Sequence, residues 1–421
     1  MNASLIGSAP VITVLRMLNR GRSRPERVRA WLVGAGAGVA AFLVCTAVSL
    51  ADFRDEGGSL TGLALALLAL PVAGLVHQAN RLATATRERR LAALRLAGAA
   101  PGDARRLGAL EGGWLALTGS LAGGLVYALT HLPGPLAPVP FVVVLLTAGG
   151  VVSGARAGRD VIASPLGVTR RPRVRGPRVR DLLAAATGVA LLVAGLTLKG
   201  GFPIGGKYGT AVAMAAGMVL LLFGLTMAAT WLIRACAART GRRARSPETL
   251  LAARLVESDP RAWARALSVV GLTVFFGAGA GAQQAVTGYG HAHALVDMAL
   301  LLAMLTSAAA LVVHQAEELI DLRRSFAALA AAGVPERSLG RVLVRQAAIA
   351  ALPVCAVAAA AGVGVVVFSV LDIYQARWLV WALTRAVAMT GIGVLTAMLM
   401  ALAARPLLRG ALRLETLRAG R

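Results

Sequence analysis

Residues 201–208 come close to the phosphate-binding loop that holds nucleotides. They read Gly-Phe-Pro-Ile-Gly-Gly-Lys-Tyr, so two glycines and Lys207 stand at the required spacing. The last position of that loop needs a Ser or Thr hydroxyl for Mg²⁺, and here it is Tyr208. The segment also follows an apolar run instead of a short strand. We therefore expect this chain to bind no nucleotide and no cofactor of its own.

His291, His293 and Asp297 offer imidazole and carboxylate groups at a spacing that metal sites use. A polar turn leading into a helix explains them better, so we expect no metal site. Asp297 lies within an apolar run, where a carboxylate is costly and tends to face other helices or water. Arg385 stands near the same end of another run and is its candidate partner, so the two form a candidate intramembrane polar pair.

His77 and His314 occupy matching places at the ends of two apolar runs. A pH-sensing role is one interpretation, since imidazole titrates near neutral pH, and packing at the membrane interface is the favoured one. The three cysteines form no Cys-x-x-Cys pair and look like small core residues. No Ser-His-Asp arrangement, carboxylate pair or zinc spacing stands in the basic, Arg-rich connections, which are the predicted cytoplasmic segments. We expect no catalytic residue and no enzyme activity.

The elements that carry these residues are apolar runs of membrane-spanning length. The chain has 421 residues, of which 57% are hydrophobic and 15% charged, which excludes a disordered chain and an ordinary soluble domain. A bilayer is crossed by about 20 apolar residues. We therefore predict an all-α polytopic membrane protein with about ten transmembrane helices. The predicted spans are 31–50, 60–79, 110–129, 139–154, 182–198, 208–233, 267–285, 295–313, 347–371 and 383–402.

The net charge of +25 is placed asymmetrically between these runs. All but five of the 44 Lys and Arg residues lie in the termini and in alternate connections. The five exceptions are Arg54, Lys199, Lys207, Arg377 and Arg385. By the positive-inside rule both termini face the cytoplasm. The positive charge is thus explained by the orientation of the chain in the membrane, and we expect membrane lipids, not nucleic acid, as partners.

Glycines recur inside the predicted spans in closely spaced groups. Small residues let helices approach closely in lipid, where hydrophobicity does not drive helix association. We therefore expect tight helix packing at these glycines. They are Gly34, Gly36 and Gly38; Gly119, Gly123 and Gly124; and Gly277, Gly279 and Gly281.

The two halves of the chain resemble each other. Residues 89–98 read RRLAALRLAG and residues 324–333 read RSFAALAAAG, each following a predicted span. We predict a cytoplasmic segment (1–30), a first four-span unit (31–154), a basic linker with two spans (155–247) and a second four-span unit with the C-terminal tail (248–421). An even number of spans separates the units, so they form a parallel repeat. Chance similarity between Ala/Leu/Arg-rich segments is the alternative.

The connection after the second span has the pattern of a helical elbow. Residues 87–90 begin a basic helical stretch, Gly98 ends it with Pro101 just beyond, and a second helix enters the next span near Glu111. An ordinary Arg-rich connection that obeys the positive-inside rule is the alternative.

This pattern resembles the FtsX-like permease family of bacterial ABC transporters, of the MacB- and BceB-like class. It reads R-R-x-x-A-L-R-x-x-G-A at residues 89–99 and then R-R-x-x-x-L-E at residues 105–111; the second copy lacks counterparts of Arg95 and Glu111. The resemblance implies that each elbow is a coupling helix that docks on a separate cytoplasmic ATPase. Two ATPase copies would bind, and they would hold the ATP and Mg. The implied coupling residues are Arg87, Glu88, Arg89, Arg90, Leu94, Arg95 and Gly98, with Arg323, Arg324, Leu329 and Gly333 in the second copy.

The resemblance implies a permease in the bacterial cytoplasmic membrane that exports, extracts or senses an amphipathic substrate, such as an antimicrobial peptide, an antibiotic or a lipid. Relatives usually carry a large extracytoplasmic domain, but the connections 51–59 and 286–294 are too short to fold into one. Two alternatives stay open: an ion-coupled secondary transporter with a parallel repeat, and a membrane regulator that moves no substrate. The nearly charge-free middles of the spans weigh against ion coupling.

Overall fold

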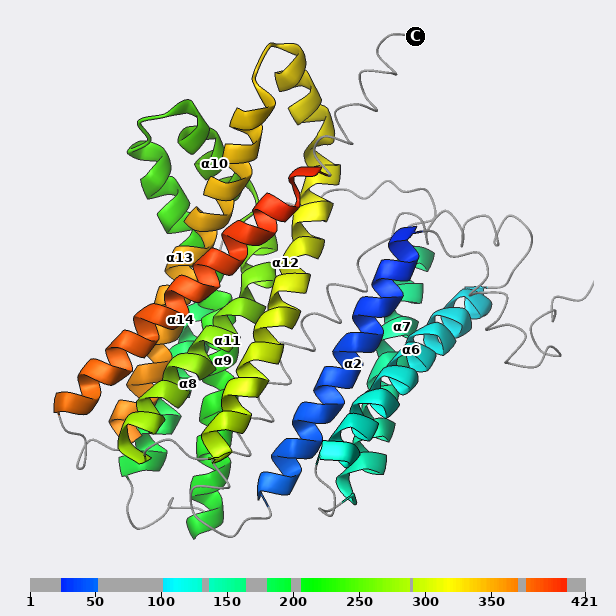
Figure 1. The fold of residues 1–421 in the computed structure, drawn as a ribbon, viewed down its shortest axis with the longest axis vertical. Helices are drawn as coiled ribbons and strands as arrows, with labels where there is room; N and C mark the ends of the chain where they lie inside the picture. The colour runs from blue at the N-terminus through cyan, green and yellow to red at the C-terminus, as the bar shows by residue number, and fades with distance from the viewer. Residues whose placement is uncertain are drawn as a thin grey trace, which may run out of the picture. The chain divides into compact units, whose positions relative to one another are not determined.

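The computed structural model describes residues 24–51, 101–130, 136–163, 180–197, 206–287, 291–369 and 376–406. Within these ranges every regular element is an α-helix, which confirms the predicted all-α class (Figure 1). The helices are α2 (Arg24–Ala51), α6 (Pro101–Thr130), α7 (Pro138–Ala163), α8 (Arg180–Thr197), α9 (Gly206–Arg242), α10 (Pro247–Ser258), α11 (Pro260–Thr287), α12 (His291–Ala331), α13 (Glu336–Ser369) and α14 (Ala376–Ala403).

Eight of the described helices are long and apolar enough to cross a membrane, and each coincides with a predicted span. Helix α8 covers the predicted span 182–198 but is not among those eight. The predicted span 60–79 lies outside the described residues, so the count of ten stays a prediction. The candidate spans are Ala30–Ser49, Gly108–Thr130, Pro138–Ala155, Ala216–Arg242, Pro260–Ala285, Val296–Ala316, Glu336–Phe368 and Arg377–Ala403.

The chain divides into two compact units, Met1–Pro172 and Arg173–Arg421. Helices α8 and α9, predicted as part of a linker, lie in the second unit, where α9 packs against α10, α11 and α13. The predicted domain boundaries themselves remain a prediction.

In the first unit, α6 packs between α2 and α7 through glycines. Gly34 and Gly38 of α2 face Gly119 and Gly123 of α6 so closely that a Cβ on either α6 glycine would overlap a carbonyl oxygen of α2. On the α7 side of α6, Gly150 of α7 approaches α6 just as closely. The glycine spacing predicted this close approach, because only a residue without a side chain lets two backbones meet.

In the second unit, α11 is the central helix and packs against α9, α12, α13 and α14. A Cβ on Gly362 of α13 would overlap the carbonyl oxygen of Phe275. Toward α14, Gly277 and Gly281 of α11 make room for the long side chains of Met389 and Arg385. The predicted packing role of Gly277 and Gly281 is thereby confirmed.

Helices α12 and α13 continue beyond the membrane-spanning length and join in a short turn (Figure 1). The 41 residues of α12 correspond to about 60 Å, twice the thickness of the hydrocarbon core. The turn follows Ala331, with Gly333 at φ 91°; Val334 N–H donates to the Leu329 carbonyl at 3.0 Å and Gly333 N–H to the Ala330 carbonyl at 3.0 Å. This is a Schellman cap, so Gly333 ends a helix as the sequence predicted.

Candidate functional site

Two places in the second unit bring candidate residues together. We call the end that carries α10 and the α12–α13 turn the turn end, and the end where α11 leads to α12 the opposite end. The intramembrane pair of Asp297 and Arg385 lies toward the opposite end, and the second set of coupling residues lies at the turn end.

At the turn end, the predicted coupling residues of the second copy follow one another along the last turns of α12. Arg323 and Arg324 are helical, but the structure describes nothing of their side chains. Leu329 packs against the apolar cluster below, and Gly333 is exposed in the turn. The first set, residues 87–98, lies outside the described residues, so its placement stays a prediction.

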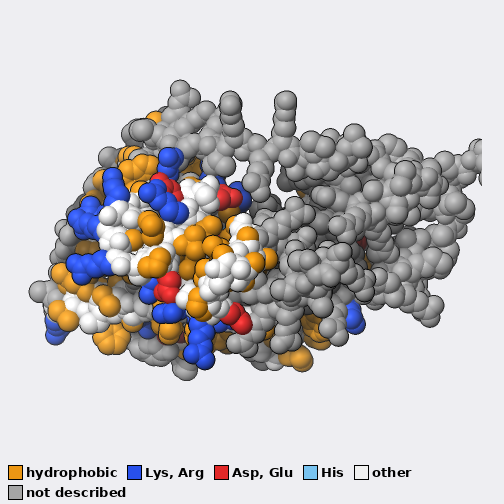
Figure 2. All heavy atoms as spheres, turned by 90° about the horizontal axis from the view of Figure 1, so that it is seen from above, with side chains coloured by type: hydrophobic (Ala, Val, Ile, Leu, Met, Phe, Trp, Pro, Cys, Tyr) orange, Lys and Arg blue, Asp and Glu red, His pale blue; other side chains and the backbone are white. Residues whose placement is uncertain are grey.

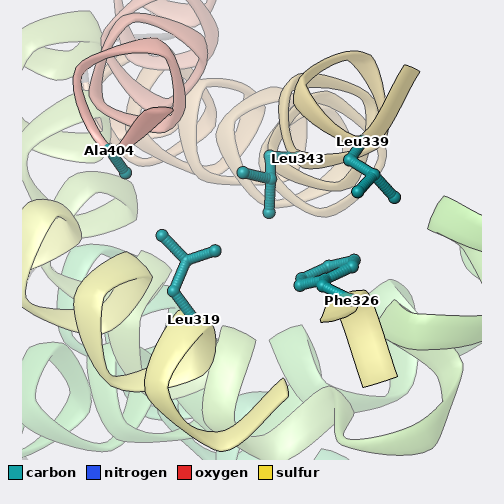
Figure 3. Close-up of a cluster of buried hydrophobic side chains, with 5 residues drawn as sticks. All are labelled: Leu319, Phe326, Leu339, Leu343 and Ala404. Carbon is teal, nitrogen blue, oxygen red and sulfur yellow. The ribbon is translucent and has the colours of Figure 1, made fainter. Parts of the chain in front are cut away.

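An apolar cluster joins the two arms of the turn. Leu319 and Phe326 of α12 point toward Leu339 and Leu343 of α13, with Ala404 beyond the end of α14 closing one side (Figure 3). Partly buried side chains from α10, from the last turns of α12 and from the turn extend the cluster; they are Leu255, Leu322, Leu329 and Val334. Because the cluster draws on α10, α12, α13 and the end of α14, the turn is anchored to the body of the unit.

An ionic network ties α13 to the start of α10. Glu248 forms ion pairs with Arg341 at 3.1 Å and with Arg345 at 3.0 Å. Arg345 also donates to Ser246 Oγ at 2.6 Å and to Thr249 Oγ1 at 2.9 Å. Ser246 is the N-cap of α10, where its Oγ accepts from the Thr249 N–H, so one arginine holds both the cap and the first turn.

Further polar contacts tie the inner part of α12 to its neighbours. Gln346 Nε2 of α13 donates to Glu318 Oε1 at 3.2 Å, and His314 lies 4.0 Å from Glu318 Oε2. The His314 ring meets Trp263 of α11 edge to face at 4.9 Å. His314 is buried, which agrees with the favoured interpretation that it packs.

The face at the turn end is strongly basic. Arginine side chains gather around its rim with few carboxylates among them (Figure 2). The described carboxylates Glu248 and Glu257 already pair with arginines of the unit. An excess of positive charge therefore faces outward, suited to a partner with an acidic surface. The exposed arginines of this end are Arg242, Arg243, Arg245, Arg254, Arg337 and Arg341.

Toward the opposite end, Asp297 of α12 and Arg385 of α14 are in direct contact. Arg385 Nη2 donates to Asp297 Oδ1 at 2.5 Å, and the two side chains are 22% and 29% exposed for Arg385 and Asp297 respectively. Gly281 of α11 lies against the stem of Arg385, where any Cβ would overlap it. Three helices thus hold the pair that the sequence suggested, and its functional role remains a prediction.

The other sequence candidates are placed as follows. Helix α12 begins at His291, as expected of a polar turn leading into a helix, and the described residues contain no group of three or more His, Cys, Asp or Glu able to hold a metal. Lys207 and Tyr208 lie in the first turn of α9, while 201–205 are outside the described residues. The cysteines are free; Cys45 and Cys355 are buried and Cys236 partly so.

Sequence reasoning missed the network around Glu248 and the Glu318–Gln346 contact. Glu248 and Arg345 look like ordinary charges of solvated connections, and nothing in their spacing shows that they meet. Gln346 stands where the first copy has Glu111, and nothing in that position shows that it meets Glu318. The N-cap signal of Ser246 before Pro247 was the one local clue.

The described helices are those of a polytopic α-helical membrane protein, and the second unit has a helical turn packed on an apolar cluster at one end and a polar pair toward the other. Comparisons with protein-family models, with curated proteins and with solved structures return no match for this chain.

Proposed function

We propose that this chain is the membrane subunit of a bacterial ABC transporter of the FtsX-like class, and that a separate ATPase docks at the α12–α13 turn. The observation that carries the proposal is the anchoring of this turn. Helix α12 extends past its candidate span, α13 is longer than a bilayer requires, and the two pack together through Leu319, Phe326, Leu339 and Leu343.

A turn anchored in this way transmits force. A push on residues 329–334 reaches α12 and α13 through the apolar cluster and α10 through the network around Glu248. Packed helices respond to such a push by moving as rigid bodies, because a close-packed interior does not deform continuously. A docked ATPase that closes on ATP would thereby move the spans.

The helix pairing inside each unit supports a repeat. In the first unit α2 packs on α6, α6 on α7 and α2 on α7; in the second, α11 packs on α13, α13 on α14 and α11 on α14. These are corresponding pairs if the two four-span units are related. The first unit would then present its own coupling helix at residues 87–98, and a second ATPase copy would bind there.

The basic face of the turn end supports a cytoplasmic position for it in the bacterial membrane, with both termini on the same side. The ATP and Mg would be held by the partner. The substrate would be an amphipathic molecule that is exported, extracted or sensed from within the membrane, where the Asp297–Arg385 pair offers a polar point of contact.

Co-purification tests the docking. An ATPase with nucleotide-binding motifs encoded beside this chain should co-purify with it, and the double change Arg323→Glu with Arg324→Glu should abolish the complex. The matched control is Arg242→Glu with Arg243→Glu, which alters the charge of the same end equally but away from the turn; it should leave the complex intact. A complex that survives the first change, or is lost equally in both, contradicts the proposal.

The Asp297–Arg385 pair is the one observation that favours the alternative of ion-coupled transport, since charged groups within spans mark ion pathways. Reconstitution separates the two. Movement of substrate that needs an ion gradient and no ATP would favour the secondary transporter, and no movement under either condition would favour a regulator.

A further inference from the structure

Three polar side chains lie in one layer of the second unit, toward its opposite end. The Thr273–Ser307 contact at 3.2 Å sets the register of α11 against α12. These consecutive helices run antiparallel. Gln284 follows Thr273 by eleven residues on α11, and Val296 precedes Ser307 by eleven residues on α12. Gln284 therefore comes level with the turn of α12 that carries Asp297.

The third side chain reaches this layer from α14. Arg385 lies against Gly281, and Gln284 follows Gly281 by three residues on the same face of α11. Gln284 of α11 therefore comes near the level at which Asp297 of α12 and Arg385 of α14 are in contact. The sequence reasoning had found two of the three.

Two hydrogen-bond donors of this layer have no partner among the residues that the structure describes. Gln284 is only 6% exposed, and its amide nitrogen makes no hydrogen bond to those residues; the same holds for Nε of Arg385. A buried donor without an acceptor costs about 1–3 kcal/mol, so an acceptor group that reached both donors would be bound favourably here.

The layer is accessible from one side. The carboxylate of Asp297 and the guanidinium of Arg385 are partly exposed, and the side chains beside them on α12 and α14 are exposed and apolar. Met298 and Leu301 on α12 and Trp381 on α14 would face acyl chains in a bilayer. A molecule that reaches this layer thus meets apolar surface and a charged pair together.

The charges select the ligand. A purely anionic group would be repelled by the carboxylate of Asp297, and a purely cationic group would be repelled by the guanidinium of Arg385. A group that carries both charges fits: its phosphate accepts from Arg385 and Gln284, and its ammonium donates to Asp297. We propose that Gln284, Asp297 and Arg385 form a binding site for the zwitterionic headgroup of a membrane phospholipid, of the phosphoethanolamine type.

This site deepens the proposed function, because it gives a membrane-embedded amphiphile a defined point of contact; it rests on that function only for its biological purpose. Binding itself is a property of this chain. A failure of headgroup binding leaves ATPase docking untouched, and a failure of docking leaves headgroup binding untouched.

The test is native mass spectrometry of the purified full chain, with phosphatidylethanolamine and phosphatidylglycerol as probes. We expect the ethanolamine lipid to be retained over the anionic one, and Gln284→Leu to weaken its binding about tenfold, the effect of losing one hydrogen bond to a charged group. Gln315→Leu is the matched control: Gln315 is also a buried amide, 1% exposed, with no hydrogen-bond partner in the described part of the chain, but it lies closer to the turn end, so binding should not change.

Gln284→Leu also separates a ligand site from a structural defect. If no ligand binds, replacing an unpaired amide by an apolar side chain leaves stability unchanged or raises it, and lipid retention stays the same. That result would overturn the proposal. So would equal retention of both lipids.

A charge exchange, Asp297→Arg with Arg385→Asp, tests recognition of polarity in variants that fold. The exchange restores an ion pair in which α12 carries the positive charge and α14 the negative one. The preference for the ethanolamine lipid should then be lost. Soluble glycerophosphoethanolamine tests the source: it should compete only weakly, because it lacks acyl chains for the apolar surface. Competition as strong as that of the lipid would show that the membrane has no part in binding and would contradict the assignment.

Discussion

Arg345 and Ser246 lie 99 residues apart in the chain, yet Nη1 of Arg345 donates to Oγ of Ser246 at 2.6 Å. The same guanidinium group also pairs with Glu248. The arginine therefore replaces water at the start of α10 and fixes that helix on α13. Since α13 leads directly into the turn, the position of α10 and that of the turn are coupled.

The first prediction concerns this contact. Arg345→Ala should weaken the attachment of α10 by about 1–2 kcal/mol, because it removes an ion pair with the partly buried carboxylate of Glu248 and a hydrogen bond to the N-cap Ser246. Hydrogen exchange of the α10 amides should speed up accordingly. Arg254→Ala is the control, since its exposed pair with Glu257 lies within α10 and contributes little. Equal exchange in both variants would show that Arg345 does not hold α10.

A second prediction concerns Gly281. Any Cβ at this position would overlap the stem of Arg385, so Gly281→Ala should displace the arginine and weaken its contact with Asp297. We expect thermal stability of the purified protein to fall. Gly391→Ala is the matched control: Gly391 lies in α14 with nothing near its Cβ position, so alanine should be neutral or slightly stabilising. A stable Gly281→Ala protein would mean that the helices repack at no cost.

A third prediction uses the Asp297–Arg385 pair itself. Asp297→Asn leaves a partly buried guanidinium without its counter-charge, and Arg385→Gln leaves the carboxylate, so each single change should destabilise the protein. The double variant should be less destabilised than the sum of the two, because neither charge remains. A double-mutant cycle of thermal stability measures this coupling; strictly additive effects would show that the two charges do not interact.

The sequence predicted most of the spans and only part of the sites, for physical reasons. A membrane span needs about 20 apolar residues, so spans such as Val296–Ala316 and Arg377–Ala403 can be identified from their own residues alone. The Asp297–Arg385 pair was also predictable, since charges are rare within spans and both lie near the same end. The Glu248–Arg345 contact was not, because charges between spans are common and their pairing depends on helix register. Nor did hydrophobicity show that α12 continues to Ala331, since its last turns are a mixed amphipathic stretch.

The last prediction concerns Gly333 and separates the shape of the turn from its attachment. At φ 91° an L-residue with a side chain is strained by about 1 kcal/mol, so Gly333→Ala should disturb the Schellman cap while leaving the cluster of Leu319 and Phe326 intact. Phe326→Ala should do the reverse: it opens a cavity in the cluster that costs about 3–5 kcal/mol locally and keeps the cap.

If the turn is the ATPase contact, Gly333→Ala should weaken ATPase binding, whereas Phe326→Ala should allow binding but lower substrate-dependent stimulation of ATP hydrolysis. The pair of measurements is co-purification and ATPase activity of the reconstituted complex, with Gly364→Ala as a control, since nothing lies near its Cβ position. Loss of binding in Phe326→Ala together with normal binding in Gly333→Ala would place the contact elsewhere, because the exposed turn would then matter less than the packing beneath it.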